Sequence, residues 1–173
     1  CDWQHRDHKA NATVGRLWKL TWTGASAAAP RPEWWVPLAM GQPAAVKLSE
    51  LVDALDHPAR QVRLTALQRL ADDAADTPEG RPVSSPARTR LLEALADPEQ
   101  STRLRVHALW ALRRAAKDEP VVGTVRSLAA GAEAALASQA LRWLGQRGDA
   151  GAREPALAQL DHADAVVRLQ AAA

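Results

Sequence analysis

The sequence of 173 residues contains neither Phe nor Tyr, and it has a single cysteine and a single methionine. Seven Trp residues therefore supply all of the aromatic bulk. The lone Cys1 cannot form an internal disulfide, and it excludes both a multi-cysteine metal site and a CxxCH haem-attachment sequence within this chain. Cofactors and metals that need several thiols are thus excluded here.

Long apolar runs and catalytic signatures are also missing. No stretch approaches the about 18 continuous apolar residues of a transmembrane helix, so we expect no membrane span. The first residues are polar and charged, no signal peptide is visible, and both ends interrupt a pattern, so we expect a piece of a larger protein. GxSxG, GxGxxG, P-loop and HExxH patterns are absent, and we expect no catalysis by this chain alone.

The charge is nearly balanced, because 22 Lys and Arg residues stand against 20 Asp and Glu residues. Neutralising several phosphates requires a clustered basic face, so we expect no nucleic-acid partner. The apolar residues make up 47% of the chain, which is enough for a core. A composition rich in Ala, Leu and Arg favours helix, and we expect a mainly α fold.

A repeated pattern fills residues 44–173. Segments 51–70 and 91–112 each read as a short amphipathic helix, an Asp-containing turn and a second apolar helix face with an Arg. Segment 157–173 begins the same pattern, and 134–145 is a weaker copy of its second half. Four alanines align the copies at spacings of 42, 32 and 31 residues: Ala66, Ala108, Ala140 and Ala171.

Each copy resolves into two helices by its apolar period. In the first copy an i, i+3, i+4, i+7 stripe marks one helix, formed by Leu48, Leu51, Val52 and Leu55. Ser85-Pro86 reads as a helix start, and Gly131 and Gly145 read as helix ends. Because a pair of short helices cannot bury both faces alone, we expect the pairs to stack as an α-solenoid.

An Asp turn followed by V-R-x-x-A-L, as in residues 62–67, resembles HEAT and HEAT-like repeats. Three copies carry the turn residue: Asp56, Asp97 and Asp161. The third unit departs from the pattern, since Ala137 stands where the Arg is expected. The resemblance covers residues 44–173 and implies an α-solenoid of HEAT-like helix pairs.

The repeated Asp and Arg residues have a structural role in such repeats. A carboxylate at the turn can accept backbone N–H groups at the start of the next helix. An arginine fork can bridge that carboxylate or the adjacent loop carbonyls. We therefore expect a structural ladder made of Asp56, Arg63, Asp97, Arg105, Asp161 and Arg168.

The beginning of the chain is different in style. In GRLWKLTW (15–22) Leu17 and Leu20 break strict alternation, but Trp, Leu and Thr suit a strand, so we expect residues 1–24 to contain a short β-strand or irregular segment. Residues 25–43 form a Pro/Trp-rich linker in which we expect no regular structure. Trp34 and Trp35 are expected to clamp this linker onto the first helix pair or onto an upstream propeller, whereas an exposed pair would mark a partner contact.

Asp2-Trp3, a His-containing loop and GRLWKL (15–20) resemble the last strand region of a β-propeller. The family is the glucose/sorbosone-dehydrogenase-like, or membrane-bound-dehydrogenase-like, propeller of planctomycete-type bacteria. There the propeller is followed by HEAT-like repeats and a c-type cytochrome domain. The resemblance implies an exported, periplasmic or cell-surface redox protein that uses a quinone or c-type haem, with its active site outside this chain.

The cluster HRDH (5–8) is the one with site-like chemistry. His5 and His8, together with Asp2, are candidates for a cofactor-binding rim in an intact propeller. The alternative is a polar surface loop, which we favour because no third metal ligand is evident. Neither a metal site nor a cofactor is expected within this chain.

Two tryptophans and a basic pair mark the second helices of the central units. Trp110 and Trp143 lie one residue apart in the alignment of the repeats, so we expect them to pack between repeats. Arg113 and Arg114 are expected on a solvated helix face.

The sequence therefore predicts a non-catalytic scaffold that binds protein domains, such as the upstream propeller and a downstream cytochrome domain, within a dehydrogenase-like redox protein. A stand-alone HEAT-like adaptor, with its N-terminal ribbon as a cap, is one alternative. The other is a part of a quinone- or haem-linked sugar or alcohol dehydrogenase. The concave face of the stack is the default partner site.

Overall fold

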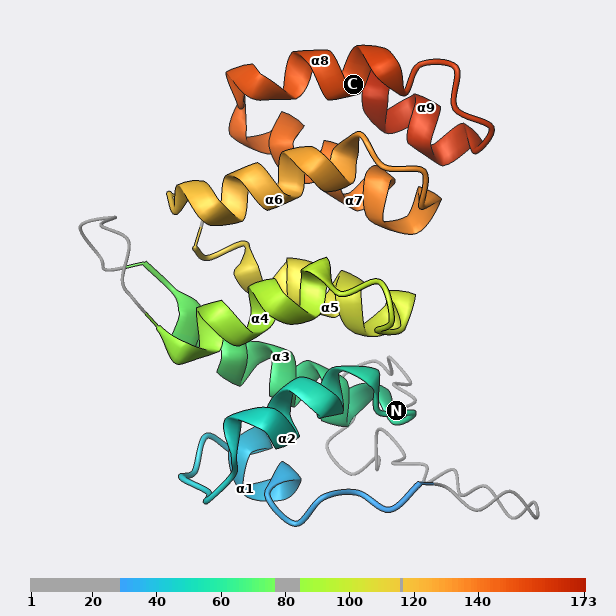
Figure 1. Ribbon diagram of the computed structural model, residues 1–173. Helices are drawn as coiled ribbons and strands as arrows, with labels where there is room; N and C mark the ends of the chain where they lie inside the picture. Colours follow the sequence, from blue (N-terminus) through green and yellow to red (C-terminus); the bar gives the residue numbers. More distant parts are fainter. Residues whose placement is uncertain (1–28, 77–84, 116) are drawn as a thin grey trace, which may run out of the picture.

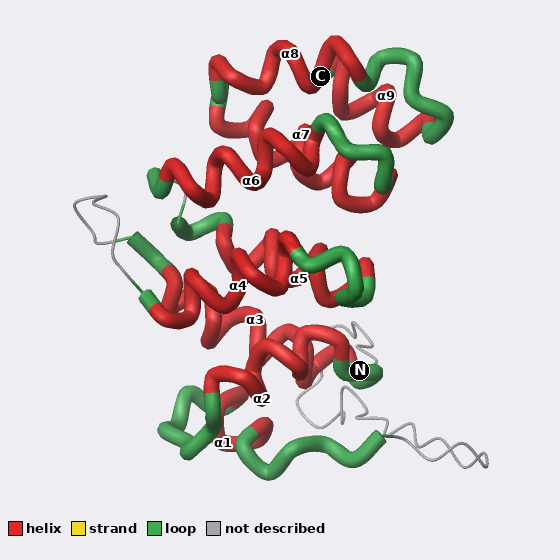
Figure 2. The backbone as a smooth tube through the Cα atoms, in the orientation of Figure 1, coloured by secondary structure: helices red, strands yellow, loops and turns green. Residues whose placement is uncertain are grey.

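The computed structural model describes residues 29–76, 85–115 and 117–173 (Figure 1). Within these ranges the chain is all-α, with nine α-helices, two short 3₁₀ turns and no strand (Figure 2). The strand expected within residues 1–24 lies outside the described part. The elements are α1 (Trp35–Ala39), α2 (Leu48–Asp53), η1 (Ala54–Asp56), α3 (Arg60–Ala74), α4 (Pro86–Ala96), α5 (Thr102–Leu112), α6 (Glu119–Ala129), α7 (Ala134–Arg147), η2 (Ala150–Ala152), α8 (Arg153–Ala158) and α9 (Ala165–Ala172).

From α2 onward the helices pack as pairs that follow one another in chain order, from α2–α3 to α8–α9 (Figure 1). The first helices of successive pairs contact each other, α2 with α4, α4 with α6 and α6 with α8. The second helices do the same, α3 with α5, α5 with α7 and α7 with α9. The predicted mainly α chain of packed helix pairs is confirmed, and it has two helical layers.

The core follows the register of the repeats. Ala66, Ala108 and Ala140 are fully buried on α3, α5 and α7, and Ala171 is half-buried on α9. The large side chains buried with them are almost all Leu and Val, which suits a core without Phe or Tyr. The alanines that align the sequence are thus core positions of the second-helix layer.

Helix ends agree with the sequence at one boundary and differ at another. Pro86 opens α4, and the Ser85 hydroxyl accepts the backbone N–H of Arg88, as expected for an N-cap. The expected end at Gly145 is wrong, because α7 continues to Arg147 and Gly148 adopts the left-handed conformation with φ of 62°. The Gly148 and Asp149 amides then donate to the carbonyls of the last turn, which completes a Schellman end.

These two glycines should respond to alanine in opposite directions. Gly148→Ala forces a Cβ into the left-handed region and is expected to cost about 1–2 kcal/mol of unfolding free energy. Gly145→Ala meets no atom within 4 Å inside a helix and is expected to gain up to about 1 kcal/mol. Urea unfolding of both variants measures the difference, and changes of the same sign would contradict this assignment of the helix end.

The linker contains one helical turn where the sequence predicts no regular structure. The prediction of no regular structure in residues 25–43 is wrong here, because Trp35–Ala39 forms α1. Pro37 is tolerated because it lies in the first turn, where its missing N–H has no intrahelical partner. Trp34 and Trp35 are partly buried against the common core, so this segment is packed onto the first helix pair.

Arg88 is the most deeply buried charged group among the described residues, with 3% of its surface exposed. Its Nε and Nη2 atoms donate to the Ala74 carbonyl at the end of α3, at 3.1 and 2.6 Å. Its guanidinium also pairs with Asp76 at 2.8 Å and with Asp118 at 2.7 Å. One side chain on α4 therefore ties the end of α3 to the start of α6.

A second buried polar side chain closes a helix end farther along the chain. Gln159, which follows α8, donates its Nε2 amide to the carbonyls of Ala129 and Gly131, each at 3.0 Å. These carbonyls belong to the end of α6, where the helix leaves its acceptors without intrahelical donors. Successive pairs are thus joined by polar caps as well as by apolar packing.

The Arg126–Asp149 pair makes stability depend on pH in the acid range. Arg126 donates Nε and Nη2 to the two carboxylate oxygens of Asp149, each at 2.9 Å. These hydrogen bonds hold the pKa of Asp149 below its ordinary value of 3.8. Because the folded carboxyl binds its proton less readily than the unfolded one, the pair stabilises the fold above about pH 4 and this contribution is lost as pH falls through the folded pKa.

Asp149→Asn should remove this contribution. We expect the unfolding free energy of the variant to fall less steeply than that of the wild type between about pH 4 and pH 2. Chemical unfolding at a series of pH values measures both curves. Parallel curves for the two proteins would show that the pair adds no acid dependence.

Candidate functional site

The residues expected at a propeller rim lie outside the residues that the structure describes. Asp2, His5 and His8 lie in residues 1–28, outside the described part of the chain. Within the described ranges, no group of three or more His, Cys, Asp or Glu side chains is arranged to hold a metal ion. No helix in those ranges has the length and apolar character needed to cross a bilayer.

The repeat arginines bind loop carbonyls. Arg63 donates Nη1 to the carbonyls of His57 and Pro58, at 2.6 and 2.9 Å. Arg168 makes the same two bonds in the last pair, to the carbonyls of His162 and Ala163 at 2.6 and 2.9 Å. Each guanidinium therefore holds the turn that precedes its own helix.

Arg105 has a different set of partners. Its Nε donates to the Leu95 carbonyl at 3.0 Å, and its Nη1 pairs with Glu133 of the next unit at 2.6 Å. Glu133 also accepts the Thr102 hydroxyl at 2.6 Å. The unit that lacks its own repeat arginine thus receives one from the preceding unit.

The turn carboxylates are held in three different ways. Asp97 accepts the backbone N–H of Glu99, and this bond lowers the pKa of Asp97. Burial raises the pKa of Asp56, but hydrogen bonds led by that of Arg103, at 2.6 Å from its Nε, bring the pKa below its ordinary value. Asp161 is exposed, and Asp164 caps α9 instead.

Asp56 and Arg103 belong to successive units, so this pair joins units rather than closing one turn. The bonds of the repeat Asp and Arg residues run to turns, helix ends and neighbouring units of the same chain. These bonds hold the helix pairs together, so a binding site is expected among the exposed side chains.

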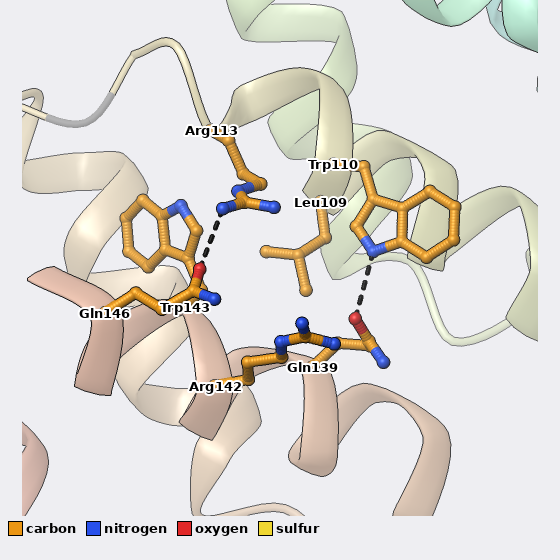
Figure 3. A pocket seen from close by; sticks show the side chains of 7 residues that line it. All are labelled: Leu109, Trp110, Arg113, Gln139, Arg142, Trp143 and Gln146. Atoms are coloured by element: carbon orange, nitrogen blue, oxygen red, sulfur yellow. Dashed lines mark hydrogen bonds between the residues drawn. The ribbon is translucent and has the colours of Figure 1, made fainter.

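A groove lies between the second helices α5 and α7, with a cavity of about 290 Å³ (Figure 3). Seven side chains line it: Leu109, Trp110, Arg113, Gln139, Arg142, Trp143 and Gln146. On α7 they follow the i, i+3, i+4, i+7 spacing of one helix face, and on α5 they occupy its last turn. Two neighbouring helices therefore present one continuous surface to solvent.

The two tryptophans have different environments. Trp143 is 4% exposed and belongs to the core, as expected of a packing residue. Trp110 is 38% exposed, although its ring contacts His107 edge-on with centroids 5.2 Å apart. Its indole Nε1–H donates to the Gln139 Oε1 atom across the groove at 3.2 Å. Trp110 thus contacts the next unit, as expected of a residue between repeats, while 38% of its surface remains in solvent.

Two arginines face the groove from opposite sides. Arg113 extends from the end of α5 and donates Nη2 to the Gln146 Oε1 atom at 2.8 Å. Arg142 extends from α7, and Leu109 lies between the two guanidinium groups (Figure 3). Neither arginine takes part in an ion pair within the described ranges, whereas the neighbouring Arg114 pairs with Asp72.

The groove has the chemistry of a binding surface. Its side chains are indole rings, guanidinium groups, primary amides and one leucine, and they include no nucleophile beside a general base. Trp and Arg are the residue types that most often dominate the energy of protein interfaces. The arrangement is suited to binding a partner.

The sequence contained part of the information for this groove. The helical spacing of Gln139, Arg142, Trp143 and Gln146 places them on one face. What the sequence could not supply is the packing of α7 beside the last turn of α5, which brings Arg113 and Gln146 into contact.

No protein-family model matches the chain, and a search of curated proteins finds no significant match.

Proposed function

We propose that residues 44–173 form a HEAT-like α-solenoid that acts as a non-catalytic scaffold and binds a protein partner through the groove between α5 and α7. The observation that carries the proposal is the partly exposed Trp110 in one groove with two arginines that have no acidic partner in the described chain. The two layers of helix pairs and the Asp-turn repeats support the HEAT-like assignment.

The size of the groove favours a protein segment over a cofactor. Pockets for drug-sized ligands and cofactors hold about 300–1,000 Å³ and bury most of their ligand. This groove, at about 290 Å³, lies at the lower edge of that range, and its side chains Trp110, Arg113 and Arg142 are exposed. It accommodates one or two side chains of a partner, while the rest of that partner lies along the second-helix layer.

Selection from a library of random peptides displayed on phage tests this proposal. We expect the folded chain to retain peptides that lose about tenfold or more in affinity when Trp110 is replaced by alanine. The matched control is Trp34→Ala, which removes a partly buried Trp that lies away from the groove, at the start of α1. Circular dichroism confirms that each variant is folded.

Two results would contradict the proposal. One is that no peptide is retained by the folded chain. The other is that the retained peptides bind the Trp110→Ala variant as well as they bind the wild type.

The proposal also concerns the larger protein in which the scaffold lies, and this part of it rests on the sequence. Residues 1–24 resemble the end of a dehydrogenase-like propeller and stand before the helix pairs, as they would in an exported redox protein. Reading the coding sequence on both sides of this chain tests the setting. Propeller blades before it and a haem-attachment CxxCH after it would support the redox setting. A start codon just before Cys1 and further helix pairs after Ala173 would support a stand-alone adaptor.

A further inference from the structure

We infer that the partner segment bound by the α5–α7 groove is acidic, with a carboxylate placed between Arg113 and Arg142 and an apolar neighbour on Trp110. This inference rests on the proposed binding function and names the chemistry of the partner. Four parts of the groove's chemistry support it: charge, hydrogen-bond donors, apolar surface and the number of charges that the groove can neutralise.

Charge is the first part. Arg113 and Arg142 are exposed, and neither forms an ion pair within the described ranges. Arg103 and Arg114 of the same layer do have carboxylate partners, Asp56 and Asp72. Arg147, which stacks on the ring of Trp143, is a third arginine of α7 and the groove region without an ion pair in those ranges. The groove therefore carries uncompensated positive charge, and a negative group is its complement.

Hydrogen-bond donors are the second part. The Gln139 Oε1 atom accepts the Trp110 indole, and the Gln146 Oε1 atom accepts Arg113. Indole and guanidinium groups only donate, so both amide oxygens must face them. The Nε2 groups of both glutamines then remain as donors, and each guanidinium has further N–H groups. A groove with this excess of donors selects an occupant rich in acceptors, as a carboxylate is.

The apolar surface is the third part. Leu109 forms the floor between the guanidinium groups, and the Trp110 indole is 38% exposed beside it. Burying this surface is favourable only for a partner that also brings an apolar side chain. A small inorganic anion would leave the indole in water, so a peptide segment matches the groove better.

The number of charges is the fourth part. Trp110 and Arg113 lie at the C-terminal end of α5, and Gln146 lies at that of α7. The C-terminal ends of helices carry partial negative charge, which opposes a dianionic phosphate more strongly than a singly charged carboxylate. Two guanidinium groups also match the charge of one dianion, so the preference for Asp or Glu side chains over phosphorylated ones rests on these helix ends.

Fluorescence anisotropy with defined peptides tests the inference. The probe is a fluorescein-labelled peptide of alternating Glu and Leu, and its counterpart has Gln in place of every Glu. We expect the Glu peptide to bind at least about tenfold more tightly than the Gln peptide. Arg113→Gln and Arg142→Gln should each weaken it about tenfold. Arg153→Gln, the same charge change at an exposed site on α8, should leave the affinity within about twofold.

The outcomes separate this inference from the proposed function. Equal binding of the Glu and Gln peptides, or an equal loss in all three arginine variants, would overturn the acidic partner. Displacement of the Glu peptide by about 1 mM inorganic phosphate would overturn it too, in favour of a small-anion site. If library peptides bind in a Trp110-dependent manner but are not acidic, the inference fails and the proposed function stands. If no library peptide binds, both fail.

Discussion

Replacing Arg88 with methionine is expected to lower the unfolding free energy by about 3–5 kcal/mol, the largest effect of any charged side chain in the described chain. Met has a helix propensity close to that of Arg and fills much of its volume. The loss of stability comes from the former partners of Arg88, which remain in the fold. Asp76 and Asp118 stay largely buried without their cation, and the Ala74 carbonyl at the end of α3 loses two donors.

The neighbouring Arg90 provides the matched control. It lies on the same helix and pairs with Glu93, but about half of each side chain is exposed. Arg90→Met should therefore cost less than about 1 kcal/mol. Adding Asp76→Asn and Asp118→Asn to the Arg88→Met variant should recover part of the loss, because uncharged amides need no buried counterion. Equal effects of the Arg88 and Arg90 variants in urea unfolding would contradict the burial of this network.

Alanine at Leu55 is expected to cost about 2–5 kcal/mol, whereas alanine at Leu160 should cost less than about 1 kcal/mol. Both leucines immediately precede a turn Asp and are equivalent in the repeat pattern. Leu55 is fully buried, because α5 packs against the η1 turn. Leu160 is 41% exposed, since the described chain has no pair packed on α8–α9 as α4–α5 packs on the first pair.

Comparing the two variants separates the effect of a residue's place within its repeat from the effect of that repeat's place in the stack. Residues with the same place in the sequence repeat should differ in energy only because one has a neighbouring pair and the other does not. The measurement is the change in unfolding free energy of Leu55→Ala and Leu160→Ala under identical conditions. A loss at Leu160 as large as that at Leu55 would mean that the leucine is covered by a part of the chain that the structure does not describe.

The helix pairs could be predicted because their information is local. The apolar stripe of Leu48, Leu51, Val52 and Leu55 has the helical period, and Ser85-Pro86 is a start that the chain uses. The end of α7 was misplaced, because the sequence alone does not tell which of Gly145 and Gly148 takes a positive φ.

Features that depend on packing between segments were harder to predict. Arg88 occupies the repeat position of Leu48, and an arginine in an apolar register was the available signal of its burial. Its three partners come from two other segments, Ala74 and Asp76 around the end of α3 and Asp118 before α6, so their identity required the structure. The α5–α7 groove is similar, since Trp110 and Gln139 meet only after the two pairs pack.

The most direct test of the account is a ¹H–¹⁵N spectrum of the chain during titration with a peptide retained in the selection. The Trp110 indole N–H signal, identified by its loss in Trp110→Phe, reports on the groove itself. We predict shifts of this signal and of backbone amides in α5 and α7, with the first helices α2 and α4 unaffected. Shifts confined to the first-helix layer, with the Trp110 signal unchanged, would contradict a binding function of the groove.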